Sequence, residues 1–149
     1  MPKIYVDADA CPVKPEIYRV ARRHSLPVVL AANSWMQTPN EDWIQLVVVD
    51  DGLDVADDWV AENVEANDIV VTADIPLAAR CLEKGSLVLG TTGRAFTEDM
   101  IGDALATREI FSQMRDVGAM TGGPPPFKKQ DRSRFLHSLD EMIRRALRD

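Results

Sequence analysis

The stretch KIYVDADACPVK, residues 3–14, decides the fold. It begins as a short apolar strand and ends in two aspartates, Asp7 and Asp9, that a single alanine separates. On an extended chain both carboxylates point to the same side. Like charges this close raise each other's pKa unless a cation or water separates them. The stretch therefore predicts a strand with an acidic site at its carboxyl end, in which at least one pKa rises.

Apolar runs and amphipathic segments alternate along the rest of the chain. We expect further strands at 27–32, 44–49, 68–73 and 86–90, and helices at 15–24, 53–64, 75–85, 97–117 and 131–148. Continuous apolar strands separated by helices indicate a mainly parallel sheet that is covered on both faces. We therefore predict an α/β fold: a three-layer sandwich around a mainly parallel central sheet of about five strands, with the first and fourth strands adjacent.

Composition limits the class of protein. A chain of 149 residues with 46% hydrophobic residues suits a single globular domain, residues 1–149. Within it, 118–149 is expected to form a Pro- and Gly-rich strap and a helix that packs on the same domain. No apolar run approaches the roughly 20 residues that span a bilayer, no signal sequence is visible, and two cysteines make no disulfide framework. These features favour a cytoplasmic protein without membrane contact, and they leave the oligomeric state open.

The net charge of −7 is unevenly distributed. Residues 24–79 contain eleven Asp or Glu and no Lys or Arg, whereas residues 128–149 contain seven Lys or Arg and four Asp or Glu. A localised acidic block is either a solvated surface or includes a metal site.

Three acids stand at predicted strand ends: Asp7 and Asp9 after the first strand, and Asp74 after the fourth. In parallel sheets, ligands bind at the carboxyl ends of the strands. Carboxylate oxygens are the ligands that Mg²⁺ and Mn²⁺ prefer. The sequence therefore predicts a site for Mg²⁺ or Mn²⁺, although Asp74 alone is also a good N-cap for the helix that follows it.

A fourth ligand is expected from the helix at 53–64. At about 100° per residue, Asp57 falls at the edge of the apolar stripe of this helix, where it can reach over the strand ends. Asp54 and Asp58 are less favoured, and Asp58 belongs to the solvent-facing side.

Basic and hydroxyl side chains are expected to compensate the acids when a phosphate binds. The candidates for contact with phosphate or nucleic acid are Lys14, Thr72, Arg94, Lys128, Lys129, Arg132 and Arg134. The glycine-rich turn at 91–93 offers backbone N–H groups to an anion. The Pro-rich strap is expected first to carry the last helix across the sheet; if it borders the cleft instead, Phe127 lies where a base could stack on it. The alternative interpretation is ordinary, because solvated helix ends are commonly basic.

Several motifs together resemble the YaiI/YqxD-like family of uncharacterised bacterial proteins. They are VDADACPVK, DVADDWV, NDIVVTADIPLAARCLEKG, GRAFTEDMI, and GGPPPF followed by DRSRF. That family is similar to the PIN-like nuclease superfamily, including its NYN branch, whose members are Mg²⁺- or Mn²⁺-dependent ribonucleases. The resemblance implies a PIN-like fold and a catalytic, metal-binding role for Asp7, Asp9 and Asp74, and less securely for one of Asp54, Asp57 and Asp58.

Three functions remain open on the sequence. The first is a metal-dependent nuclease that acts on RNA, or on another phosphate-containing substrate, through metal-activated water. The second is a haloacid-dehalogenase-like phosphatase with Asp7 as nucleophile and Asp9 as general acid, although Cys11 stands where that family has threonine. The third is a non-catalytic module that binds RNA or protein.

Overall fold

The computed structural model describes residues 2–50, 52, 55–99 and 127–148. Most of the predicted helix at 97–117, nearly all of the strap at 118–127, and Asp54 lie outside these described residues.

The core of the molecule is a six-stranded sheet in the order β3-β2-β1-β4-β5-β6. Strands β1 to β5 are parallel, and β6 is antiparallel to β5. The prediction of a mainly parallel sheet with the first and fourth strands adjacent is confirmed. The sixth strand was missed because two residues carry no detectable periodicity. The strands are β1 Ile4–Asp7, β2 Val28–Ala32, β3 Ile44–Val48, β4 Ile69–Val71, β5 Leu87–Leu89 and β6 Ala95–Phe96.

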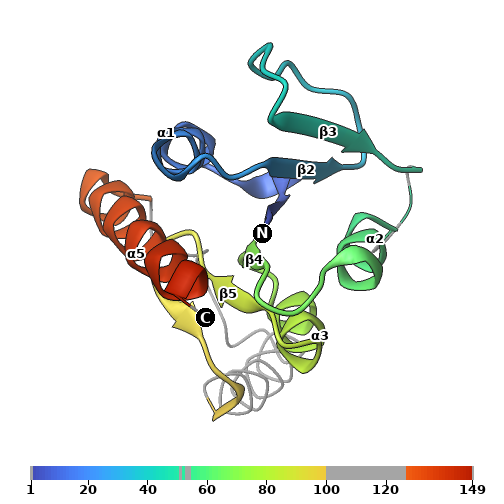
Figure 1. The fold of residues 1–149 in the computed structure, drawn as a ribbon. Helices are drawn as coiled ribbons and strands as arrows, with labels where there is room; N and C mark the ends of the chain where they lie inside the picture. Colours follow the sequence, from blue (N-terminus) through green and yellow to red (C-terminus); the bar gives the residue numbers. More distant parts are fainter. Residues whose placement is uncertain (1, 51, 53–54, 100–126, 149) are drawn as a thin grey trace, which may run out of the picture.

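Helices cover both faces of the sheet, as a three-layer sandwich requires (Figure 1). Alternate strand residues face opposite layers, so that Ile4 and Val6 join one hydrophobic core and Tyr5 joins the other. The first core receives α1 and α5, and the second receives α2 and α3. The helices are α1 Lys14–His24, α2 Val55–Asn63, α3 Ile75–Glu83 and α5 Lys129–Arg148.

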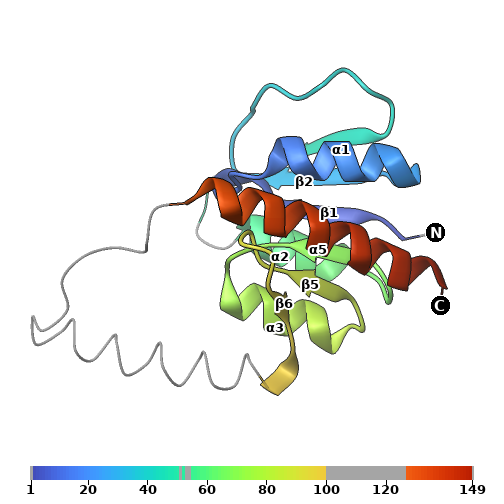
Figure 2. The same ribbon diagram turned by 90° about the vertical axis from the view of Figure 1, so that its left-hand side faces the viewer.

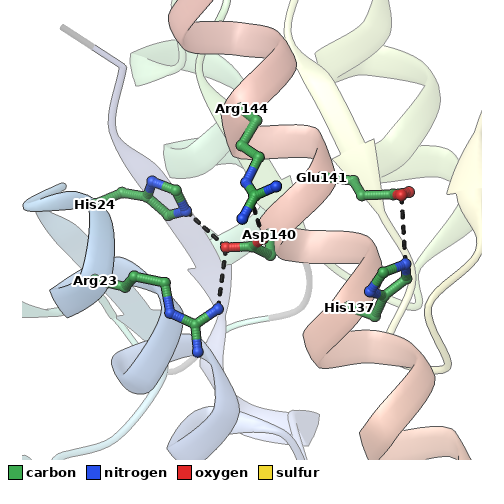
Figure 3. A network of polar contacts seen from close by, with 6 residues as sticks. All are labelled: Arg23, His24, His137, Asp140, Glu141 and Arg144. Atoms are coloured by element: carbon green, nitrogen blue, oxygen red, sulfur yellow. Dashed lines mark hydrogen bonds and ion pairs between the residues drawn. The ribbon is translucent and has the colours of Figure 1, made fainter.

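The helices α1 and α5 lie side by side on their face and both begin at the edge of the sheet where the parallel strands end (Figure 2). A polar network holds them together toward the other edge (Figure 3). Asp140 of α5 is 7% exposed; it accepts hydrogen bonds from His24 at 2.7 Å and from Arg23 at 3.2 Å, and it forms an ion pair with Arg144 at 3.1 Å. These contacts, led by the hydrogen bond from His24, lower the pKa of Asp140.

Within the described part of the chain, no helix combines the length and the apolar character that a membrane crossing requires.

Candidate functional site

The strand order reverses its direction between β1 and β4. From β1 the chain moves outward to β2 and β3, and from β4 it moves in the opposite direction to β5 and β6. Ligands of such α/β sheets bind outside the carboxyl ends of the strands at this reversal point. Asp7 is the last residue of β1, and Thr72 directly follows β4. The predicted acids at these strand ends therefore lie where the topology favours ligand binding.

Thr72 connects the two strand ends. Its side chain is buried, with the residue 1% exposed, and its hydroxyl donates to Asp7 Oδ2 at 3.0 Å. The hydroxyl oxygen of Thr72, Oγ1, in turn accepts the backbone N–H of Asp74 at 3.0 Å. A single hydroxyl thus fixes the Asp7 carboxylate against the chain that carries Asp74. A direct contact of Thr72 with phosphate stays a prediction.

Asp7 is the acid whose protonation the site perturbs. Burial raises its pKa, the hydrogen bond from Thr72 lowers it, and the charges of Asp74 and Asp9 raise it again. The net direction is upward. The rise expected from the opening stretch therefore occurs at Asp7, although loss of solvent contributes more than the neighbouring carboxylates.

Asp9 lies on a short 3-10 helix, Ala8–Ala10, that follows β1 directly. Its side chain is exposed, and its Oδ2 accepts the backbone N–H of Asn33 at 2.9 Å. Asn33 is the first residue after β2, so this bond ties the ends of two neighbouring strands.

Asp74 is the N-cap of α3. Its Oδ1 accepts the backbone N–H of Leu77 at 2.8 Å, and Pro76 occupies the first turn of the helix. The capping interpretation is therefore correct for one of its oxygens. The charge of the same carboxylate also acts on Asp7. Asp7, Asp9 and Asp74, the acids at or just after the strand ends, are called the strand-end group below.

The helical acids occupy different surroundings. Asp57 is half-buried in the first turn of α2, as its place on the helix predicted, and its charge acts on Cys81 of α3. Asp58 pairs with Arg80 at 2.6 Å on the outer surface. The charges of Asp74 and Asp9 act on Asp7, whereas Asp57 acts on Cys81 and Asp58 pairs with Arg80.

The fit of a metal ion depends on how many oxygens converge. Among the described residues, no group of three or more His, Cys, Asp or Glu side chains is arranged to hold a metal ion. Mg²⁺, however, is commonly bound through one or two carboxylates, with waters and substrate phosphates completing its ligands. The partly buried Asp7, under the charges of Asp74 and Asp9, suits such an open site and does not form a closed metal cage.

The predicted phosphate-binding residues gather at the same edge of the sheet as the acids. Lys14 begins α1, and its Nζ donates to the Cys11 carbonyl at 3.0 Å. Arg94 is exposed in the turn between β5 and β6. Lys128 and Lys129 are exposed at the start of α5. The turn and α5 are in contact, because a Cβ on Gly93 would lie 2.9 Å from the backbone of Arg134.

Besides Lys14, two more of the basic candidates are engaged within the protein. Arg132 donates to the Pro12 carbonyl at 2.7 Å and to Glu16 at 3.0 Å, and its guanidinium lies 5.0 Å from the centre of the Phe127 ring. Arg134 pairs with Asp131 at 3.6 Å. Arg132, with Phe127 packed against its guanidinium, thus joins the start of α5 to the segment before α1 and to the first turn of α1. Contact of either residue with RNA stays a prediction.

Sequence reasoning missed Asn33 and Glu16. Asn33 Oδ1 and Glu16 Oε2 are buried side-chain oxygens without a hydrogen-bond partner among the described residues. Asn33 follows β2 as Asp7 ends β1, so the rule that singled out polar residues at strand ends could have found it. Glu16 gives no such signal, because its side chain contacts Arg132, a residue that lies 116 positions away in the sequence.

Comparisons with known proteins place these residues in a family. A model described as "Uncharacterized BCR, YaiI/YqxD family" matches residues 5–145. A UPF0178 protein of Paramagnetospirillum magneticum is 53% identical, over 99% of this chain and 98% of its own length. UPF0178 proteins of Rhodopseudomonas palustris and Brucella ovis are 51% and 55% identical, over 98% and 97% of this chain and 92% and 91% of their own lengths. No solved structure matches the chain.

Proposed function

We propose that this chain, which belongs to the YaiI/YqxD family of bacterial proteins, is a divalent-metal-dependent nuclease that cuts RNA. One observation carries the proposal: the carboxylate of Asp7 and the chain that carries Asp74 meet at the reversal point of a parallel sheet, joined by the buried hydroxyl of Thr72. The likeness of the family motifs to PIN-like nucleases supports it. The buried, unpaired Cys11 and Cys81 fit a reducing cytoplasm, where we place the protein.

In this proposal, the acids of the strand-end group and Thr72 have different roles. Asp7, Asp9 and Asp74 would hold Mg²⁺ or Mn²⁺. The bound ion would polarise a phosphate oxygen and lower the pKa of a water molecule. Thr72 keeps the Asp7 carboxylate oriented, and its hydrogen bond favours the ionised form that binds a cation. Asp57, from α2, remains our candidate for a further ligand, ahead of Asp58 and Asp54.

RNA must approach a group of carboxylates, so the surrounding cations are part of the proposal. Arg94, Lys128 and Lys129 are exposed at the same edge and would attract the phosphate backbone. The first turn of α1 also begins there, and its N-cap, Val13, makes no side-chain hydrogen bond to it. Unsatisfied N–H groups and the helix dipole favour an anion at such a terminus.

The test is cleavage of a labelled single-stranded RNA with Mn²⁺, with Mg²⁺ or with a chelator. We expect products only with the metal. Asp7→Asn and Asp74→Asn should reduce the rate by about a hundredfold or more, because even outer-shell changes at metal sites cost about 10- to 100-fold. Asn can still cap α3, so Asp74→Asn removes charge without removing the cap. Glu62→Gln, at an exposed position of α2, is the matched control and should leave the rate unchanged.

The same preparations separate the alternatives. Turnover of a small phosphomonoester with a trapped phosphoaspartate at Asp7 would establish the phosphatase. Binding of RNA without hydrolysis under any metal condition would establish the binding module. Cleavage that persists in Asp7→Asn would assign the activity to a contaminant and refute the proposal.

A further inference from the structure

A recessed surface lies on the outer side of α1 and extends toward the edge of the sheet where the parallel strands begin. It is a cavity of about 310 Å³ between α1 and the segment 39–44 that leads into β3. Its volume is close to the lower limit of pockets that hold small organic ligands, about 300 Å³. The lining residues that bear on its function are Pro15, Tyr18, Arg19, Arg22, Glu41 and Trp43.

One face of α1 forms the inner wall. The lining positions 15, 18, 19 and 22 follow the spacing i, i+3, i+4, i+7, which places them on a single stripe of the helix. The stripe carries one aromatic ring and two guanidinium groups and no acid. At 1.5 Å per residue it extends roughly 10 Å along the helix axis. It begins one residue after Lys14, at the edge of the sheet where Asp7 lies.

The opposite wall is anchored to the sheet. The carbonyl of Trp43 accepts the backbone N–H of Val28 at 2.8 Å, and the next residue, Ile44, begins β3. Trp43 and Tyr18 are half-buried and pack against the hydrophobic core beneath them. Because packing limits the movement of both rings, the cavity has two aromatic side chains that need little ordering when a planar ligand enters.

Charge favours an anionic occupant. Arg19 is exposed and has no ion-pair partner in the described part of the chain. Arg22 pairs with Glu41 at 3.7 Å, but their side chains are 73% and 40% exposed, and such surface pairs are weak. Both arginines can therefore contact phosphate. A planar base together with a phosphate matches two aromatic rings flanked by two guanidinium groups.

We propose that this cavity binds one nucleotide of a single-stranded RNA, on the side of α1 that leads away from the cleavage site. The base stacks on Tyr18 or Trp43, and Arg19 and Arg22 hold the adjoining phosphates. This proposal deepens the proposed function and rests on it for the identity of the ligand. Its consequence is that a substrate strand must extend past the scissile bond to bind fully.

The experiment measures binding of a fluorescein-labelled single-stranded RNA of about ten nucleotides by anisotropy. Full-length Asp7→Asn protein is the background, so that no strand is cut. Trp43→Leu removes a stacking surface and should weaken binding by about tenfold or more. Arg19→Ala should weaken it several-fold and reduce its salt dependence. Trp43→Phe should restore most of the affinity. Arg145→Ala, an exposed arginine on α5, is the matched control and should bind as the background does.

The outcomes also distinguish this proposal from the nuclease. Arg19 is exposed, so Arg19→Ala decides the matter if Trp43→Leu fails to fold. Equal affinity for Arg19→Ala, Arg145→Ala and the background overturns the cavity proposal, even if the wild-type protein cleaves RNA. Weakened binding by the cavity variants supports it, even if the wild type cleaves nothing. Equal affinity for a mononucleotide and the longer strand, or for double-stranded RNA, would also overturn it.

Discussion

Two aspartates, Asp140 on α5 and Asp7 at the end of β1, have opposite electrostatic surroundings. Asp140, between α1 and α5, receives His24, Arg23 and Arg144, and its pKa is lowered (Figure 3). Asp7, at the end of β1, loses solvent and faces the charges of Asp74 and Asp9, and its pKa is raised. Within the described part of the chain, no Lys or Arg forms an ion pair with the half-buried Asp7.

We propose that this difference separates an acid that serves the fold, Asp140, from an acid that serves a site, Asp7. The cationic side chains around Asp140 connect α1 with α5, and these contacts engage both of its carboxylate oxygens. The uncompensated charge at Asp7 costs stability, as is common where function requires a strained group. An added cation would remove that cost. Variants of the two aspartates should therefore change stability in opposite directions.

The largest effect on stability should come from Asp140→Asn. The variant keeps the size of the side chain but weakens two charged hydrogen bonds between helices and one ion pair along α5. We expect the free energy of unfolding to fall by about 2 kcal/mol, since hydrogen bonds to charged groups contribute about 1.5–3 kcal/mol. Urea denaturation measures it. Asp58→Asn, which breaks the exposed pair with Arg80, is the control and should cost under about 1 kcal/mol. Equal losses in the two variants would contradict the special role of Asp140.

Thr72→Val should have the next largest effect. Valine keeps the branched shape but leaves Asp7 Oδ2 and the Asp74 N–H without their common partner, which should cost about 1–2 kcal/mol. Loss of the hydrogen bond should also raise the pKa of Asp7 further. Thr72→Ser retains the hydroxyl and should recover RNA cleavage. If valine and serine behave alike in cleavage, Thr72 acts only through packing.

A smaller change of opposite sign is expected for Asp7→Asn in chelator. Removing the buried charge should stabilise the metal-free protein by about 0.5–1 kcal/mol, as is typical of relief at a strained site. Added Mn²⁺ should then stabilise the wild type more than the variant, because binding to the folded state adds to stability. Thermal unfolding with and without Mn²⁺ measures both. A lower melting temperature for Asp7→Asn in chelator would show that the Asp7 charge serves the fold.

The smallest expected effect is the pH dependence of the stability changes caused by Asp7→Asn and Asp140→Asn. It distinguishes the two aspartates most clearly. The folded pKa of Asp7 lies above the unfolded value, so its destabilising charge disappears as pH falls through the folded pKa. The advantage of Asp7→Asn should therefore shrink between neutral pH and about pH 4. The folded pKa of Asp140 is lowered, so its contribution is complete above the unfolded value and is lost only below about pH 4. Denaturant titrations at several pH values would reveal the two windows.

The acids at the strand ends could be predicted from the sequence because the hydrophobic pattern of a strand, and the aspartate that follows it, are local properties of the chain. An apolar run followed by aspartate marks a strand end wherever the strand lies in the sheet, so Asp7, Asp9 and Asp74 could be named in advance. The same rule overlooked Asn33, a neutral residue at the end of β2. It did not foresee that Asp140, within a long amphipathic helix, meets His24 and Arg23 more than 110 residues away in the sequence.

The sequence by itself determined the succession of strands and helices along the chain and the placing of acids at the carboxyl ends of β1 and β4. These depend on periodicity and on the chemistry of single residues. Only the tertiary structure decided which acid carries the raised pKa, because burial of Asp7 and the bond from Thr72 require strands 65 residues apart to pair. It also decided which cations are engaged, since Arg132 reaches Glu16 only when α5 packs on α1. Desolvation and ion pairing depend on distance in space, and distance along the chain does not fix them.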